Sequence, residues 1–185
     1  MSEIINEIKR VLSRIENNLH FFIGKNYANR DNYPIDFCKW TEEVTIKNRI
    51  IYENKSNKDR EKARRRRGQV FWLDFGINIG SEFNDYHFCV VVKESLYTAI
   101  VVPLSSVKEN TPDWKFSEEL IKEIGEINGL PDPDKRQHYA LINQIRAVSK
   151  QRLSTFKYKG QYLKLKLEPE QMDIIDEGLL LLCKH

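Results

Sequence analysis

The chain has 185 residues, of which 41% are hydrophobic and 31% are charged, and its formal net charge is +3. This length suits one well-cored domain with an appendage and is too short for two full-sized domains. The sequence has no apolar run of about eighteen residues to span a membrane, and its charged N-terminus is unlike a signal peptide, so a cytoplasmic protein is expected. Cys38, Cys89 and Cys183 are too few and too scattered for a disulfide framework or a zinc site, and reduced thiols are expected.

The N-terminal stretch predicts a helical hairpin. Apolar residues recur there at helical spacing, and Ser2 stands where a helix cap is expected. The apolar positions are Ile4, Ile8, Val11, Leu12, Ile15 and Leu19. A second helix is predicted from about Pro34 to Glu53. Two helices have too little surface to bury a stable core alone, so the hairpin is expected to pack on the following domain or on a second copy of the chain.

The basic residues of the chain are concentrated in its first third. Residues 1–67 hold 16 Lys and Arg against 10 Asp and Glu, whereas residues 68–185 hold 14 against 17. The segment 55–67 contains eight basic and two acidic residues. Such a run attracts polyanions such as nucleic acids, and it is equally typical of a solvated, partly helical linker, so both interpretations stay open.

From Gly68 onward the pattern changes to short β-type runs that are separated by turns. Five strands are predicted, at residues 69–75, 87–94, 98–106, 138–148 and 161–167. Strands this short and this close favour a small barrel. The long connection before the fourth strand predicts one short helix, at about Ser117 to Ile124. An apolar stripe that includes Met172 and Ile175 predicts a final helix.

The order of these segments resembles the PemK/MazF family of toxins from type II toxin–antitoxin systems. The resemblance covers about residues 67 to 182 and depends on GSE (80–82), VVPLSS (101–106) and NQIRAVSKQRL (143–153), together with the terminal amphipathic helix. It divides the chain into an N-terminal helical extension (1–54), a basic linker (55–67) and a PemK/MazF-like toxin barrel (68–185). The helical extension lies outside the usual family pattern.

The resemblance implies an α+β fold: a small SH3-like β-barrel of the PemK/MazF/CcdB type, with a C-terminal helix and, in this chain, the N-terminal helical hairpin. It further implies a homodimer that cleaves single-stranded RNA as a metal-independent endoribonuclease, with no cofactor, and that a cognate antitoxin protein neutralises. The ribose 2′-OH would be the nucleophile, and the product would be a 2′,3′-cyclic phosphate. This reaction needs a proton acceptor, a proton donor and groups that stabilise the charged phosphorane.

The resemblance also indicates catalytic residues. His87 lies where family members usually have an arginine followed by proline, and a histidine can accept a proton as well as donate one. A lone histidine at a strand entrance is also often structural, so both roles stay open at this position. Ser105 and Ser106 lie where relatives carry hydroxyls that contact the scissile phosphate, although a hydroxyl pair at a strand end is also ordinary turn chemistry. Arg146 matches the family's arginine and suits phosphate recognition. The expected catalytic set is therefore His87, Ser105 and Arg146.

Other residues are candidates for RNA binding rather than catalysis. Gln144 matches the family's glutamine, and it is as well explained by a structural role in satisfying backbone groups. Asn143 replaces an aspartate that serves as the proposed base in some relatives, and an amide cannot take that proton; Leu141 likewise replaces an arginine. Phe83 and Tyr86 are candidates for stacking on unpaired bases, whereas Trp72 and other strand aromatics are assigned to the core. The basic residues Arg64, Arg65, Arg66 and Arg67 are expected to bind the RNA backbone.

Two other functions remain open at this stage. The losses at Asn143 and Leu141 favour a barrel that binds RNA without cutting it. A toxin that acts on a protein target is the other alternative, because a related barrel family poisons DNA gyrase.

Overall fold

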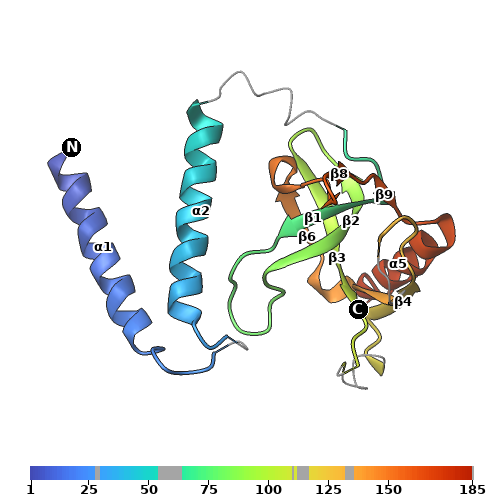
Figure 1. The fold of residues 1–185 in the computed structure, drawn as a ribbon, viewed down its shortest axis with the longest axis horizontal. Coiled ribbons are helices and arrows are strands. Elements are labelled where there is room, and N and C mark those ends of the chain that lie inside the picture. Colours follow the sequence, from blue (N-terminus) through green and yellow to red (C-terminus); the bar gives the residue numbers. More distant parts are fainter. Residues whose placement is uncertain (28–29, 54–63, 110, 112–116, 132–135, 185) are drawn as a thin grey trace. The chain divides into compact units, whose positions relative to one another are not determined.

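The computed structural model describes residues 1–27, 30–53, 64–109, 111, 117–131 and 136–184 (Figure 1). The chain divides into two units, which are considered separately. The first, here the helical unit, comprises Met1–Asn54 and Ile77–Ser81; the second, here the barrel unit, comprises Lys55–Gly76 and Glu82–His185. Residues 54–63, which include most of the predicted basic linker, lie outside the described residues.

The helical unit contains α1 (Ser2–His20) and α2 (Tyr33–Glu53), as the apolar periodicity predicts. The N-cap of α1 is Met1 and no side chain caps it, so the prediction of Ser2 as the cap is wrong. Ser2 is already the first helical residue, where its hydroxyl cannot take the capping position. Neither helix contains a buried residue.

The barrel unit is built on one curled antiparallel sheet. Its strands are β1 (Gln69–Asp74), β2 (Tyr86–Glu94), β3 (Thr98–Ser106), β4 (Ile121–Gly125), β5 (His138–Leu141), β6 (Arg146–Ser149) and β9 (Leu165–Lys166). They lie in the order β4-β5-β3-β2-β1-β9, and β6 also pairs with β3. A separate two-stranded hairpin joins β7 (Lys157–Tyr158) to β8 (Gln161–Tyr162), and the chain ends in α5 (Pro169–Leu182). The predicted α+β class, with a small barrel-like sheet, a C-terminal helix and an N-terminal helical hairpin, is confirmed.

Two predicted elements differ from the structure. Residues 121–125 form β4 and pair with β5, so the helix predicted at 117–124 is wrong over most of its length. The apolar spacing of this short segment fits both structures, and the edge of the sheet supplies the pairing that decides between them. The single strand predicted at 138–148 is divided by a 3₁₀ turn, η2 (Ile142–Gln144), into β5 and β6. Its two halves pair with the two ends of β3.

The sheet has a hydrophobic core on each face. The first core contains Val90, Val102 and Leu104 and extends to Met172 and Ile175 of α5. The second contains Leu73, Cys89, Val101 and Val148. The face that carries the first core is here called the first face, and the face that carries the second core is called the second face. Alternate residues of a strand point to opposite faces, so the face of each remaining strand residue follows from its neighbours in these cores.

Helix α5 is anchored to the first face at both of its ends. Glu168 and Gln171 form a reciprocal capping box, and the Gln171 amide also donates to the carbonyl of Glu126, at 2.8 Å. Near its other end, Gly178 lies so close to Ile142 that an added Cβ would stand 2.7 Å from the Ile142 Cγ1 atom. Helix α5 therefore packs directly against Ile142 of the η2 turn.

Candidate functional site

The structure places the three expected catalytic residues on the second face of the sheet. His87 of β2 pairs with Leu73 of β1, and Arg146 of β6 pairs with Val101 of β3. Leu73 and Val101 both belong to the second core. Directly opposed residues share a face. Ser105 lies four residues beyond Val101 on β3 and therefore points the same way. The β2–β3 register pairs Phe88 with Leu104, so one further step sets His87 opposite Ser105.

Arg146 is held by contacts on two sides. Its guanidinium lies 5.3 Å from the centre of the Phe75 ring, and its Nη2 atom donates weakly to the Gln144 Oε1 atom at 3.5 Å. Burial lowers the pKa of Arg146; the charge of Glu82 opposes this shift, and that of Arg152 adds to it. An arginine remains charged at neutral pH even so. The site thus presents a positioned cation on the same face as His87.

Gln144 connects Arg146 to the segment that leads into β2. Its Oε1 atom also accepts a hydrogen bond from the backbone N–H of Phe83, at 3.0 Å. The Phe83 ring in turn lies 4.3 Å from the His87 ring and 5.2 Å from the Phe75 ring, between centroids. In this structure Gln144 therefore satisfies a backbone N–H group, which is the structural role considered for it from the sequence. Phe83 packs partly buried against the second core and is not an open stacking platform.

Two charged residues near Arg146 were not singled out from the sequence. Glu82 is the acidic residue of the GSE motif, and Arg152 belongs to the QRL end of the last motif. Arg152 donates to the backbone carbonyl of Asp74, at the end of β1. Glu82 and Arg152 could have been noticed from the sequence, since both lie inside the motifs that carry the family resemblance. Only the fold brings their charges close to Arg146.

Cys89, which lies near this site, is unreactive. Cys89 is fully buried in the second core, two residues after His87 on β2. Burial raises the pKa of its thiol far above the ordinary range, outweighing the opposing effects of a backbone hydrogen bond from Phe71 and the charge of Arg152. A neutral thiol is a poor nucleophile.

Several predicted RNA-binding residues lie elsewhere. Ser106 points to the first face, where it pairs with the buried His138. Tyr86 also points to the first face and stacks on Trp72, with 6.2 Å between ring centroids. Asn143 is exposed in the η2 turn. Ser105 and Ser106 are therefore separated by the sheet, because consecutive strand residues point in opposite directions.

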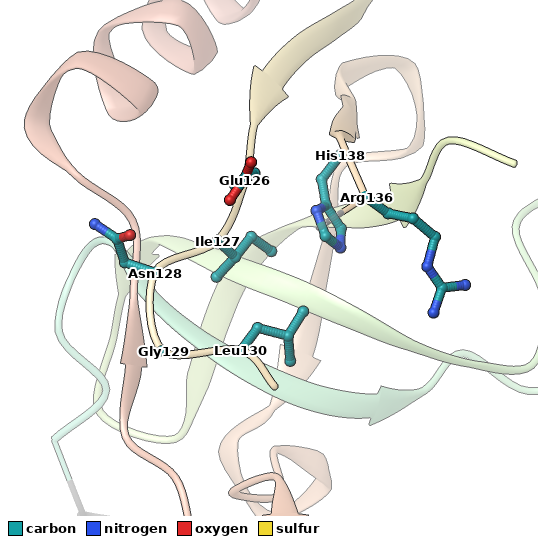
Figure 2. A pocket seen from close by; sticks show the side chains of 7 residues that line it. All are labelled: Glu126, Ile127, Asn128, Gly129, Leu130, Arg136 and His138. Carbon is teal, nitrogen blue, oxygen red and sulfur yellow. The ribbon is translucent and has the colours of Figure 1, made fainter. Parts of the chain in front are cut away.

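His138 lines a pocket of about 170 Å³ on the first face. Figure 2 shows the side chains that surround it, with Ile127 and Leu130 beside the imidazole. The lining residues are Glu126, Ile127, Asn128, Gly129, Leu130, Arg136 and His138. The amide of Asn128 donates to Glu168 at 2.9 Å, which links this pocket to the start of α5. None of the predicted site residues lines it.

The four consecutive arginines have different environments. The backbone N–H of Arg65 donates to Glu94 at 2.8 Å, and its guanidinium lies 5.1 Å from the Phe71 ring centre. Arg67 donates to the Asp176 carboxylate of α5 and to the carbonyl of Val92. Arg64 and Arg66 are exposed. The side chains of Arg65 and Arg67, which are half of the predicted RNA-binding run, therefore contact other parts of the barrel unit.

The described part of the chain contains no group of three or more His, Cys, Asp or Glu residues placed to hold a metal ion. None of its described helices is long and apolar enough to cross a membrane.

Comparison with known proteins assigns the chain to a family. A family model described as "PemK-like, MazF-like toxin of type II toxin-antitoxin system" matches residues 66–183. The match covers well over half of the sequence, and the chain belongs to this family. Among solved structures, the chain is similar to one titled "Crystal structure of MazE-MazF (Form-II) from Deinococcus radiodurans", at 15% identity and a TM-score of 0.38, over 64% of this chain and 95% of that chain. A search of curated proteins found no match.

Proposed function

We propose that this toxin-family member is an endoribonuclease that cleaves single-stranded RNA and thereby stops translation. The observation that carries the proposal is the common placement of His87, Ser105 and Arg146 on the second face of the sheet, with Arg146 held by Phe75 and Gln144. These groups have the chemistry that phosphodiester transfer needs: an imidazole, a hydroxyl and a fixed cation.

In the proposed reaction, the ribose 2′-oxygen attacks the adjacent phosphorus and loses its proton to a base. A new O2′–P bond forms, the P–O5′ bond breaks, and the departing 5′-oxygen takes up a proton. The His87 imidazole accepts the proton from the 2′-oxygen and donates a proton to the departing 5′-oxygen. Arg146 stabilises the extra negative charge on the phosphorane, and Ser105 donates a hydrogen bond to one of its oxygens.

The partners follow from the family. We propose that a cognate antitoxin protein neutralises the chain and that two barrel units associate as a homodimer. The exposed edge strands of such a sheet often need covering by a second copy. Sedimentation of the full chain at tens of micromolar tests the dimer, and a monomer at that concentration contradicts it.

The test of the activity is cleavage of a long single-stranded RNA by the purified full chain in the presence of EDTA. We expect discrete fragments with 2′,3′-cyclic phosphate ends, and we expect His87→Ala to reduce the rate by at least 100-fold, as loss of a positioned proton-transfer group does. His20→Ala removes an exposed histidine of α1 and is the matched control, with wild-type rates expected.

His87→Arg restores the residue type that relatives carry and separates two roles. A variant that regains most of the rate assigns this position to charge stabilisation. A variant as slow as His87→Ala assigns it to proton transfer, which arginine cannot perform.

A second function is favoured by one observation. Leu141 is buried and Asn143 carries an amide, so neither position supplies the arginine or the acidic base that some relatives have there. A barrel that binds RNA without cutting it would shift the RNA in a gel and leave its length unchanged in the same experiment.

A further inference from the structure

The β7–β8 hairpin is a two-stranded element of the barrel unit whose four strand residues are all exposed. Lys157 pairs with Tyr162 and Tyr158 with Gln161, and the turn between them is formed by Lys159 and Gly160. These two turn residues have φ angles of +45° and +85°, the left-handed pair that a tight two-residue hairpin requires. The backbone N–H of Leu163 donates to the carbonyl of Phe156 at 2.9 Å, which closes the base of the hairpin.

The hairpin and the strand that follows it concentrate basic and aromatic side chains. Residues 157–166 contain four lysines and two tyrosines, and they contain no acidic residue. Tyr162 is 70% exposed and Tyr158 is 38% exposed. Across the described part of the chain, no carboxylate forms an ion pair with any of these four lysines. This local charge contrasts with the excess of acidic residues over residues 68–185 as a whole.

Each face of the hairpin carries one tyrosine, because Tyr162 lies directly opposite Lys157 and Tyr158 lies directly opposite Gln161. The Lys157 Nζ atom lies 5.5 Å from the centre of the Tyr162 ring, and the Lys159 Nζ atom lies 5.4 Å from the Tyr158 ring. Each exposed ring is therefore accompanied by an ammonium group at cation–π distance. A single-stranded nucleic acid has the complementary pattern, because each base has a flat face and each nucleotide carries a negative phosphate.

A row of aromatic rings joins the hairpin to the start of β2. Phe156, the residue before Lys157, lies 5.8 Å from Trp72, and Trp72 lies 6.2 Å from Tyr86, between ring centroids. Tyr86 is 43% exposed and directly precedes His87 in the sequence. This row of rings lies on the first face of the sheet, whereas His87 points to the second face, so RNA held by the hairpin lies outside the proposed cleavage site.

We propose that the β7–β8 hairpin is a second RNA-binding surface, which holds single-stranded RNA outside the cleavage site. Lys157 and Lys159 contact phosphates, and Tyr158 and Tyr162 stack on unpaired bases. This inference rests on the proposed function for the identity of the nucleic acid. The exposed tyrosines favour single strands, since the bases of a duplex are already stacked and are not available to side chains.

The charge contribution is tested by Lys157→Ser/Lys159→Ser in the full chain. The probe is a fluorescent, mixed-sequence RNA of about 20 nucleotides whose riboses are all 2′-O-methylated, so that the nucleophile is absent and binding is measured without cleavage. Each lost phosphate contact should reduce the slope of log K against log salt by about 0.7. We expect a slope about 1.4 smaller than that of the wild type. Lys93→Ser/Lys108→Ser removes two exposed lysines elsewhere in the barrel unit and should retain the wild-type slope.

The stacking contribution is tested by Tyr158→Ala/Tyr162→Ala. Loss of a base stacked on a ring weakens binding about fivefold or more, so removal of both rings should lower the affinity at least about 25-fold while the salt slope stays the same. Tyr97→Ala, which removes a tyrosine that is 51% exposed in the β2–β3 turn, is the matched control. Circular dichroism of each variant checks that the fold is retained.

Unchanged affinity and slope in both hairpin variants overturn the inference, as does a wild type that leaves the RNA unbound. The cleavage test is separate. If unmodified RNA stays intact while both hairpin variants lose affinity, the proposed nuclease activity is wrong and the binding surface stands.

Discussion

The helical unit and the barrel unit both contain helices with apolar residues at helical spacing, yet the two units differ completely in burial. Every residue of the two described hydrophobic cores lies in the barrel unit, whereas α1 and α2 contain no buried residue. Between the two helices lies a groove of about 600 Å³, lined largely by apolar side chains such as Leu12, Leu19 and Ile35. Apolar periodicity is therefore enough to specify a helix but not to bury it, because burial needs a surface of matching shape on another element.

Truncation of one isoleucine in each unit should give the largest difference between the two units. Ile175 of α5 is fully buried, and Ile175→Ala should lower the free energy of unfolding by about 3 kcal/mol, the sum of lost transfer energy and the cavity left behind. Ile8 of α1 is 52% exposed, and Ile8→Ala should cost less than about 0.5 kcal/mol. Urea unfolding of both variants measures this. Equal losses would mean that α1 is covered in solution, as expected if the hairpin packs on a barrel or on a second chain.

A buried charge sharpens the comparison, since only the barrel unit has one among the described residues. Lys150 is 3% exposed and its Nζ atom lies 2.8 Å from the Glu94 carboxylate, which also accepts from the Arg65 backbone. Glu94→Gln leaves the ammonium without its counter-ion and should cost about 2 kcal/mol, less than a fully buried pair because Glu94 still reaches solvent. Glu94→Gln/Lys150→Met should recover part of that loss, and Glu109→Gln, at an exposed position, should be neutral.

The same carboxylate predicts a pH dependence. The hydrogen bond from the Arg65 backbone, followed by that from Lys150, holds the pKa of Glu94 below its ordinary value. A lowered pKa in the folded state stabilises the fold above the unfolded pKa of about 4.3, and this stabilisation is lost as the pH falls through the folded value. The stability difference between wild type and Glu94→Gln should therefore shrink between pH 5 and pH 3. A difference that stays constant would remove Glu94 from this role.

The contact between α5 and η2 predicts a smaller effect. An added methyl group at Gly178 would meet Ile142 at 2.7 Å, and Ile142 is fully buried. Overpacking of about 2 kcal/mol is partly offset by about 1 kcal/mol of helix propensity, so Gly178→Ala should cost about 1 kcal/mol. Glu177→Ala, one exposed position earlier, should be neutral or slightly stabilising. Thermal unfolding compares the two, and an equal response would show that Ile142 moves without cost.

The smallest effect concerns the arginine run. Arg67 and Asp176 form an ion pair whose side chains are each more than 40% exposed, so Arg67→Ser should cost only about 0.5 kcal/mol. Arg64→Ser/Arg66→Ser should leave stability unchanged. If the run forms a basic rim for RNA, the same double variant weakens RNA binding equally for all sequences and flattens its salt dependence. Unchanged affinity and salt slope would show that the run is only a linker.

Much of the local structure could be predicted from the sequence. The bounds of α2 and most of the principal strands follow the expected ranges because the side-chain period reports the element type directly. Where the prediction was wrong, at β4 and at η2, the deciding interactions come from distant parts of the chain. The edge of β5 recruits residues 121–125, and α5 and the Phe83 backbone contact the residues of the η2 turn.

In the candidate site, too, some features follow from the sequence and others from contacts between distant parts of the chain. The sequence by itself determined the chemistry that is available, through the motif residues His87, Ser105, Gln144 and Arg146, and it determined the apolar stripes of every long helix. Only the tertiary structure decided that Ser105 shares a face with His87 while Ser106 does not, and that Gln144 is bound to the Phe83 backbone. The physical reason is that spacing along a chain encodes the direction of a side chain relative to its own element, whereas strand register and helix packing decide what it meets there.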